Sequence, residues 1–242
     1  MAGHSHWAGI KHKKGRADKE RSKIFSKLSR EITVAAKLGD KDPDMNPRLR
    51  TAIQAAKQAN MPKDNISRAI SKSEMSGDKN YESLRYEGFG PSNVALIIET
   101  LTDNKNRSAS SIRTVLQKKG GRLGESGSTT HLFENCGIIH LDKNKIKEEE
   151  IFEFAINAGA KDCKSLDEIF EIITEKEDFY KIKTEIEKKI ESLTVSSVEW
   201  RPLNYIDLSK EQSEQILEVL SALEELDDVQ TIFTNANLKN LQ

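Results

Sequence analysis

The chain has 242 residues, of which 36% are hydrophobic and 32% charged, and its formal net charge is −1. This length predicts two or three small domains with charged surfaces rather than one large core. Two cysteines without CxxC spacing argue against a structural zinc site and are expected to be reduced thiols. The N-terminus has no apolar leader, and the longest apolar run, residues 94–98, is too short to span a membrane, so we expect a cytoplasmic protein that contacts no membrane.

Charge is distributed unevenly along the chain. Residues 1–78 carry 17 basic and 9 acidic side chains, whereas the other 164 residues carry 21 basic and 30 acidic ones. Nine of the basic and only two of the acidic side chains lie in the first 30 residues. A net charge of +8 on one segment against −9 on the remainder indicates a polyanionic partner for the basic end.

The composition of residues 1–17 predicts a mobile basic arm, because this segment holds too little apolar surface to offset the conformational entropy that the chain loses on ordering. Cations alternate there with rings that can stack on unpaired bases, a pattern that suits RNA. An alternative is that Trp7 packs against the following helices. The candidate nucleic-acid-binding residues of the arm are His4, His6, Trp7, Lys11, His12, Lys13, Lys14 and Arg16.

Residues 18–78 predict a bundle of three amphipathic helices. The first runs over 18–38 with Gly39 as a C′ residue, and the second begins at the N-cap Asn46. The third follows Pro62, and its Asn65 and Arg68 are candidates to reach bases. The cations that share the outer face of the first helix, and that we interpret as a phosphate-binding stripe, are Lys19, Lys23, Lys27, Arg30 and Lys37.

Beyond residue 78 the sequence alternates between strand and helix periodicity. Strands are expected at 81–87 and 94–100 around a turn at 88–91, followed by a helix at 107–119 and a strand near 128–133. The segment 135–204 then has the β-α-β-β-α-β order of a ferredoxin-like domain, with elements at 137–141, 148–158, 161–165, 169–174, 176–191 and 195–201. A capping box at Ser209 and Gln212 begins a helix to about 226, and 229–234 is a closing strand.

These elements predict an α+β fold, in which an N-terminal three-helix bundle precedes two ferredoxin-like α/β domains and the third domain is inserted in the second. The expected boundaries are 1–17 for the arm, 18–78 for the bundle, 79–134 plus 205–242 for the discontinuous α/β domain, and 135–204 for the inserted domain.

The loop 102–107 joins a strand to a helix N-terminus, which is a natural anion site. Asn104 and Arg107 are therefore candidate nucleic-acid ligands. An equally good interpretation is that they are ordinary turn and cap residues. The acidic helix at 211–228 repels phosphate, and its simplest role is that of a solvated helix face.

No catalytic motif for a hydrolase, a metalloprotease or a nucleotide-binding enzyme occurs in the chain. The histidines of the arm lie on a segment too polar and glycine-rich to hold a rigid site. We therefore expect no enzyme, no cofactor, no metal site and no small-molecule substrate. Removal of Met1 would leave Ala2-Gly3-His4, a possible square-planar copper site that we regard as incidental.

The start AGHSHWAGIKHKKGRADKERSKIFSKLSREITVAAK closely resembles the YebC/PmpR family, which includes the mitochondrial translational activator of cytochrome oxidase. The likeness continues through NPRLRTAI, ANMPKDNISRAI, YEGFGP, TDNKNR, GGRLG and LEELDDVQTIFTNANL. The resemblance implies three domains, a designation of members as probable transcriptional regulators, a role of others in translation at the ribosome, and no catalytic residue. Thr129-Thr130-His131 and Asn135-Cys136 depart from the family pattern, which puts in doubt a nucleic-acid contact by 128–136.

The sequence thus favours a non-enzymatic nucleic-acid-binding regulator of gene expression. An RNA- and ribosome-associated translation factor is preferred, because the third helix offers few base-reading side chains and no dimerisation heptads are present. A regulator that binds promoter DNA is the alternative, and a metal-dependent hydrolase using the arm histidines ranks last.

Overall fold

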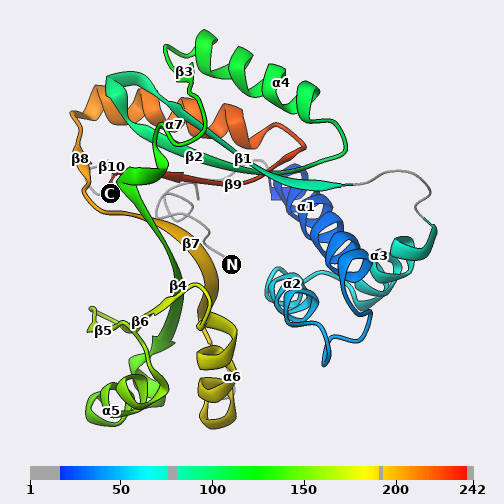
Figure 1. Cartoon of the computed structure of the whole chain (residues 1–242), viewed down its shortest axis with the longest axis vertical. Helices are drawn as coiled ribbons and strands as arrows, with labels where there is room; N and C mark the ends of the chain where they lie inside the picture. The colour runs from blue at the N-terminus through cyan, green and yellow to red at the C-terminus, as the bar shows by residue number, and fades with distance from the viewer. Residues whose placement is uncertain (1–16, 76–80, 191–192, 239–242) are drawn as a thin grey trace. The chain divides into compact units, whose positions relative to one another are not determined.

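A computed structural model describes residues 17–75, 81–190 and 193–238 of the chain (Figure 1). The chain forms two compact units, of which one ends at His131 and resumes at Tyr205, and the other spans Leu132–Asn204. Helices precede mostly antiparallel sheets, so the α+β class expected from the sequence is confirmed. Within the described ranges, no helix is both long and apolar enough to cross a membrane.

The first unit begins with three packed helices, α1 (Ala17–Leu38), α2 (Pro47–Gln58) and α3 (Lys63–Met75). Asn46 caps α2 as expected, since its side chain accepts a hydrogen bond from the Leu49 backbone N–H at 3.1 Å. The buried side chains that form the core are Ile32, Ala35, Ala36, Leu49, Ala52, Ile53, Ala56, Met61, Ile66 and Ala69.

Gly39 follows α1 as expected, but it does not have the left-handed conformation of a C′ glycine. Its role is steric, because a Cβ at this position would lie 2.7 Å from the Asn46 side-chain nitrogen. That nitrogen donates hydrogen bonds to the carbonyl oxygens of Ala35 at 2.9 Å and Asp40 at 2.6 Å. Gly39 therefore leaves room for the side chain that ties the end of α1 to the start of α2.

The same unit continues into a four-stranded sheet of order β3-β1-β2-β9. Helices α4 and α7 pack against one face of this sheet, where their apolar side chains share a core with Leu96 and Ile98 of β2 (Figure 1). A small parallel pair, β8 with β10, was not foreseen from the sequence. The elements are β1 (Glu82–Phe89), β2 (Ala95–Thr102), α4 (Lys105–Lys118), β3 (Arg122–Leu123), β8 (Ile206–Asp207), α7 (Lys210–Glu224), β9 (Val229–Thr234) and β10 (Ala236–Asn237).

Two local expectations in this unit were wrong. Strand β1 continues through Gly88 and Phe89, and the turn lies at Pro91–Asn93, where Ser92 and Asn93 both have φ near +58°. The segment 128–133 is not a strand, because Thr130–Leu132 forms a short 3-10 helix. The backbone N–H groups of Gly127, Thr129 and Thr130 donate hydrogen bonds to the buried Glu87 carboxylate instead of to a neighbouring strand.

The second unit is a ferredoxin-like domain whose six elements follow the order read from the sequence. Its sheet has the order β5-β6-β4-β7 and is antiparallel throughout. Phe170 and Phe179 are the largest of its fully buried side chains, and they lie in the core between the sheet and its helices. The elements are β4 (Phe133–Asp142), α5 (Glu148–Ala158), β5 (Asp162–Ser165), β6 (Ile169–Glu175), α6 (Phe179–Lys189) and β7 (Val195–Pro202).

Candidate nucleic-acid interface

The cationic stripe expected on α1 contacts acidic residues of its own chain. Lys23 forms an ion pair with Glu225, which directly follows α7. About two helical turns further along the same face, Arg30 Nη1 lies 3.3 Å from Asp228 Oδ1. At least these two cations are therefore engaged within the first unit, and the stripe is not a continuous surface held ready for phosphate.

Arg30 is fixed by further contacts besides its ion pair. Its Nη1 donates to the carbonyl oxygens of Asp227 at 2.7 Å and Leu101 at 3.2 Å. The guanidinium also lies over the ring of Tyr81, 5.5 Å from the ring centroid, in a cation–π arrangement. Because the guanidinium donates to three acceptors and stacks on one ring, Arg30 serves as a structural anchor between α1 and the sheet.

Asp228 accepts hydrogen bonds from several elements at once. Its carboxylate receives the Ser108 hydroxyl at 2.7 Å, the Thr102 hydroxyl at 3.0 Å and Arg107 Nη2 at 3.1 Å. Burial by itself raises the pKa of Asp228, but these hydrogen bonds and the charge of Arg107 outweigh it and lower the pKa below its ordinary value. A charged carboxylate therefore joins β2, α4 and, through Arg30, α1.

The predicted anion site at 102–107 is occupied by internal contacts. Asn104 is the N-cap of α4, and its side chain accepts from the Arg107 backbone N–H at 3.0 Å. The Arg107 guanidinium lies 2.6 Å from Asp103 and 3.1 Å from Asp228. The structure thus favours the turn-and-cap interpretation of both residues over a role as phosphate ligands.

A cleft of about 440 Å³ is lined by Arg30 of α1, by the first half of α4 and by the turn after α7. Four carboxylates line it against two guanidinium groups, so its charge does not suit a phosphate. The acidic side chains that line the cleft are Asp103, Glu225, Asp227 and Asp228.

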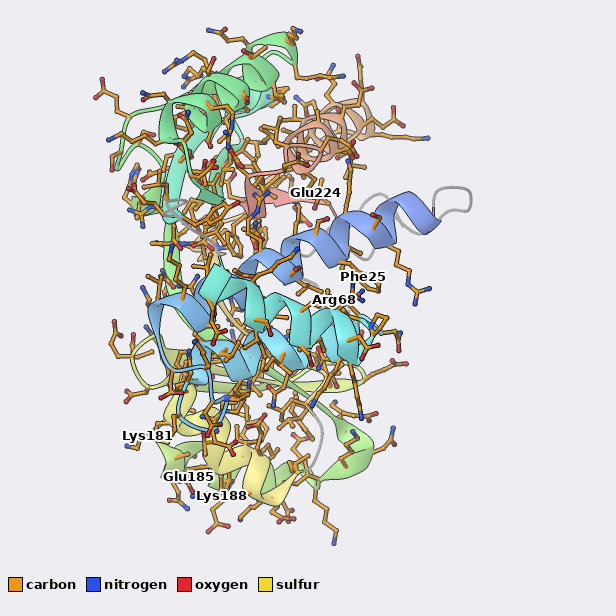
Figure 2. The ribbon with its side chains drawn as sticks, turned by 90° about the vertical axis from the view of Figure 1, so that its right-hand side faces the viewer. Phe25, Arg68, Lys181, Glu185, Lys188 and Glu224 are labelled. Carbon is orange, nitrogen blue, oxygen red and sulfur yellow. The ribbon has the colours of Figure 1, made fainter. Side chains whose placement is uncertain are left out.

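Besides Arg21 and Lys37 on α1, exposed cations of the bundle lie on α2 and α3. Arg68 is exposed on α3 (Figure 2). Asn65, one turn before it, is half-buried. Sequence reasoning missed three further exposed cations, although the charge count over 1–78 already included them. The exposed cations of α2 and α3, none of which forms an ion pair with another described residue, are Lys57, Lys63, Arg68 and Lys72.

The remaining candidates are placed as follows. Lys27 is half-buried on α1 and Lys37 is exposed near its end. Lys19 lies in α1, but its side chain is outside the described part of the chain. The arm residues that also lie outside the described ranges are His4, His6, Trp7, Lys11, His12, Lys13, Lys14 and Arg16.

The segment 124–131 is organised around the buried carboxylate of Glu87. The backbone N–H groups of Gly127, Thr129 and Thr130 donate to it at 2.8–2.9 Å. Burial by itself raises the pKa of Glu87, but the hydrogen bonds from this segment lower it to about 2. Thr129, one of the departures from the family pattern, is fully buried, which agrees with the doubt about a nucleic-acid contact there.

The chain is similar to known proteins along nearly its whole length. Residues 5–76 match the family described as "TACO1/YebC protein N-terminal domain", and residues 81–236 match "TACO1/YebC second and third domain". A crystal structure of a conserved hypothetical protein from Aquifex aeolicus has a TM-score of 0.81 and 43% sequence identity, and the match covers 96% of each chain.

Three curated relatives are each named "probable transcriptional regulatory protein". The protein from Pelagibacter ubique is 58% identical, with 99% of this chain and 100% of the relative covered. The protein from Desulfosudis oleivorans is 46% identical, with 99% and 98% covered. The protein from Zymomonas mobilis is 48% identical, with 98% and 96% covered. Given these matches over the bundle and both α/β domains, the chain belongs to the TACO1/YebC family.

Proposed function

We propose that this protein is a non-enzymatic nucleic-acid-binding regulator of gene expression that acts on RNA, with the ribosome as its favoured partner. The observation that carries the proposal is the set of exposed cations on α2 and α3, which belongs to the same basic N-terminal part of the chain, residues 1–78, as the basic segment 1–16. Cations of this kind supply affinity for phosphates through counterion release, without dependence on base sequence.

The preference for RNA rests on the composition of the N-terminal segment. Trp7 and the three neighbouring histidines are rings that stack on unpaired bases, which single-stranded and folded RNA offers and plain duplex DNA does not. Binding of ribosomal RNA by this segment, together with phosphate contacts by the bundle, accounts for both the charge asymmetry and the rings.

A regulator that binds duplex DNA is the second candidate. Helices α2 and α3 are joined by a short turn, residues 59–62, in which Asn60 has φ +58°. A helix–short turn–helix unit with an exposed polar second helix is an arrangement that enters the major groove in many DNA-binding proteins. The names of the three curated relatives favour the same class of function.

The proposal is tested by charge reversal on the bundle with a matched control. Lys63→Glu with Arg68→Glu removes two exposed cations of α3. Arg113→Glu with Lys181→Glu makes the same change in net charge on α4 and α6; Arg68 and Lys181 are labelled in Figure 2. Affinity for single-stranded RNA, measured by fluorescence anisotropy, is expected to fall at least about tenfold in the α3 variant and much less in the control.

Two further outcomes separate the candidate functions. Co-sedimentation of the wild-type protein with ribosomes at physiological salt is expected for the RNA function. Tighter binding to duplex DNA than to RNA, with no co-sedimentation, would favour the transcriptional candidate. Equal losses in the α3 variant and the control would mean that net charge alone, and not the bundle face, controls binding.

A further inference from the structure

The turn after α7 presents carboxylates to the face of α1 that carries cations. Two ion pairs connect them, Lys23 with Glu225 and Arg30 with Asp228. The two pairs lie about two turns apart on the same helical face, since residues seven apart in a helix return to the same side. The acidic turn therefore places two carboxylates next to two cations of α1, the same cations that the phosphates of a bound polyanion would contact.

The two pairs differ in depth. Arg30 and Asp228 have side-chain exposures of 24% and 13%, and Arg30 makes additional contacts with backbone carbonyls. Lys23 and Glu225 have exposures of 29% and 58%. Exposed ion pairs contribute little net stability and are screened by salt, so the outer pair can be exchanged at low cost while the inner pair keeps α1 in place.

We propose that Glu225 is an intramolecular competitor of nucleic acid: it occupies Lys23 on the cationic face of α1 in the unbound protein, and a polyanion displaces it. The inner pair, Arg30 with Asp228, remains formed and keeps α1 in place while the outer pair is exchanged. This inference rests on the proposed nucleic-acid-binding function and adds an autoinhibitory contact to it. The contact would favour ligands with several closely spaced phosphates, because only these replace the carboxylate and gain further cations.

Carbodiimide cross-linking reports the contact directly in the full-length protein. The reagent activates a carboxylate and joins it by an amide bond only to an amine already in contact, so a Lys23–Glu225 cross-link measures occupancy of the outer pair. The control is Lys119, the C-cap residue of α4, with Glu218 of α7, which lie 2.7 Å apart and have similarly accessible side chains. Cross-linked peptides are quantified by mass spectrometry with and without a saturating poly(U) oligonucleotide.

The expected result is a several-fold lower yield of the Lys23–Glu225 amide in the presence of the oligonucleotide, with an unchanged yield of the Lys119–Glu218 amide. An oligonucleotide that binds by anisotropy but leaves both yields unchanged would overturn the competitor role and leave the proposed function intact. An oligonucleotide that does not bind at all would remove the proposed function and this inference with it.

Variants give an independent readout on affinity. Glu225→Gln removes the competing charge, whereas Glu214→Gln makes the same charge change at an exposed position on α7 that has no ion pair with another described residue. At low salt, Glu225→Gln is expected to bind poly(U) about two- to fivefold more tightly than the wild type, the range that corresponds to loss of one exposed ion pair. Equal affinities of the two variants would contradict the proposal.

Discussion

The Arg30 guanidinium and the Asp228 carboxylate lie 3.3 Å apart although 198 positions separate them in the chain. This pair joins the N-terminal bundle to the sheet of the first unit, and Asp228 also holds the start of α4 through Ser108 and Arg107. Asp228, which lies in the segment LEELDDVQT that resembles the family, thus connects α1, α4 and the sheet through its carboxylate.

Asp228→Asn is expected to destabilise the protein. The amide keeps the size of the side chain but loses the charge-assisted hydrogen bonds to Arg30 and Arg107, which corresponds to about 1–3 kcal/mol. Urea unfolding measures the change. Asp227→Asn is the control, because Arg30 contacts only the backbone carbonyl of this exposed neighbour, and it should leave the free energy of unfolding nearly unchanged.

Glu87→Gln tests the buried carboxylate and its pH dependence. The folded protein lowers the pKa of Glu87 from 4.5 to about 2, so its contribution to stability is complete above pH 4.5 and is lost as the pH falls toward 2. The variant should therefore lose about 3 kcal/mol near pH 7 and only about 1 kcal/mol near pH 3, relative to the wild type. Glu82→Gln, exposed on the same strand, should show no such difference; a constant loss at both pH values would contradict the assignment.

Gly39→Ala is expected to cost about 1–2 kcal/mol, because the new methyl group pushes the Asn46 side chain away from the carbonyl oxygens of Ala35 and Asp40. Asn46→Ala alone should cost a similar amount through loss of the α2 cap. The double variant should be no less stable than Asn46→Ala. Additive losses in thermal or urea unfolding would show that the backbone of Gly39, and not its closeness to Asn46, matters.

Trp7→Ala separates stacking on RNA from charge attraction, since it leaves every cation in place. Loss of one aromatic stacking partner should weaken binding to single-stranded RNA by about ten- to hundredfold at an unchanged salt dependence, and binding to duplex DNA should change little. The melting temperature should barely move. A large drop in melting temperature would instead identify Trp7 as a packing residue, and equal weakening toward RNA and duplex DNA would favour the transcriptional candidate.

The sequence by itself determined the features whose causes are local. The cap at Asn46 and the capping box of Ser209 with Gln212 were predicted correctly, because each depends on residues within one helical turn. The order of elements in the inserted ferredoxin-like domain was also correct, since strand and helix periodicities alternate clearly there.

Only the tertiary structure decided which partners the charged side chains have. The outer face of α1 reads as a cationic stripe in sequence, yet the pairing of β2 with β9 brings residue 228 beside residue 102 and places an acidic turn against Arg30. The strands β3, β8 and β10 are two residues long, too short for any periodicity to mark them. The conformation of the segment 128–133 also has a long-range cause, because its backbone N–H groups donate hydrogen bonds to Glu87, some forty residues away in the chain. Long-range hydrogen bonds and ion pairs of this kind follow from sheet register and helix packing, which no local pattern contains.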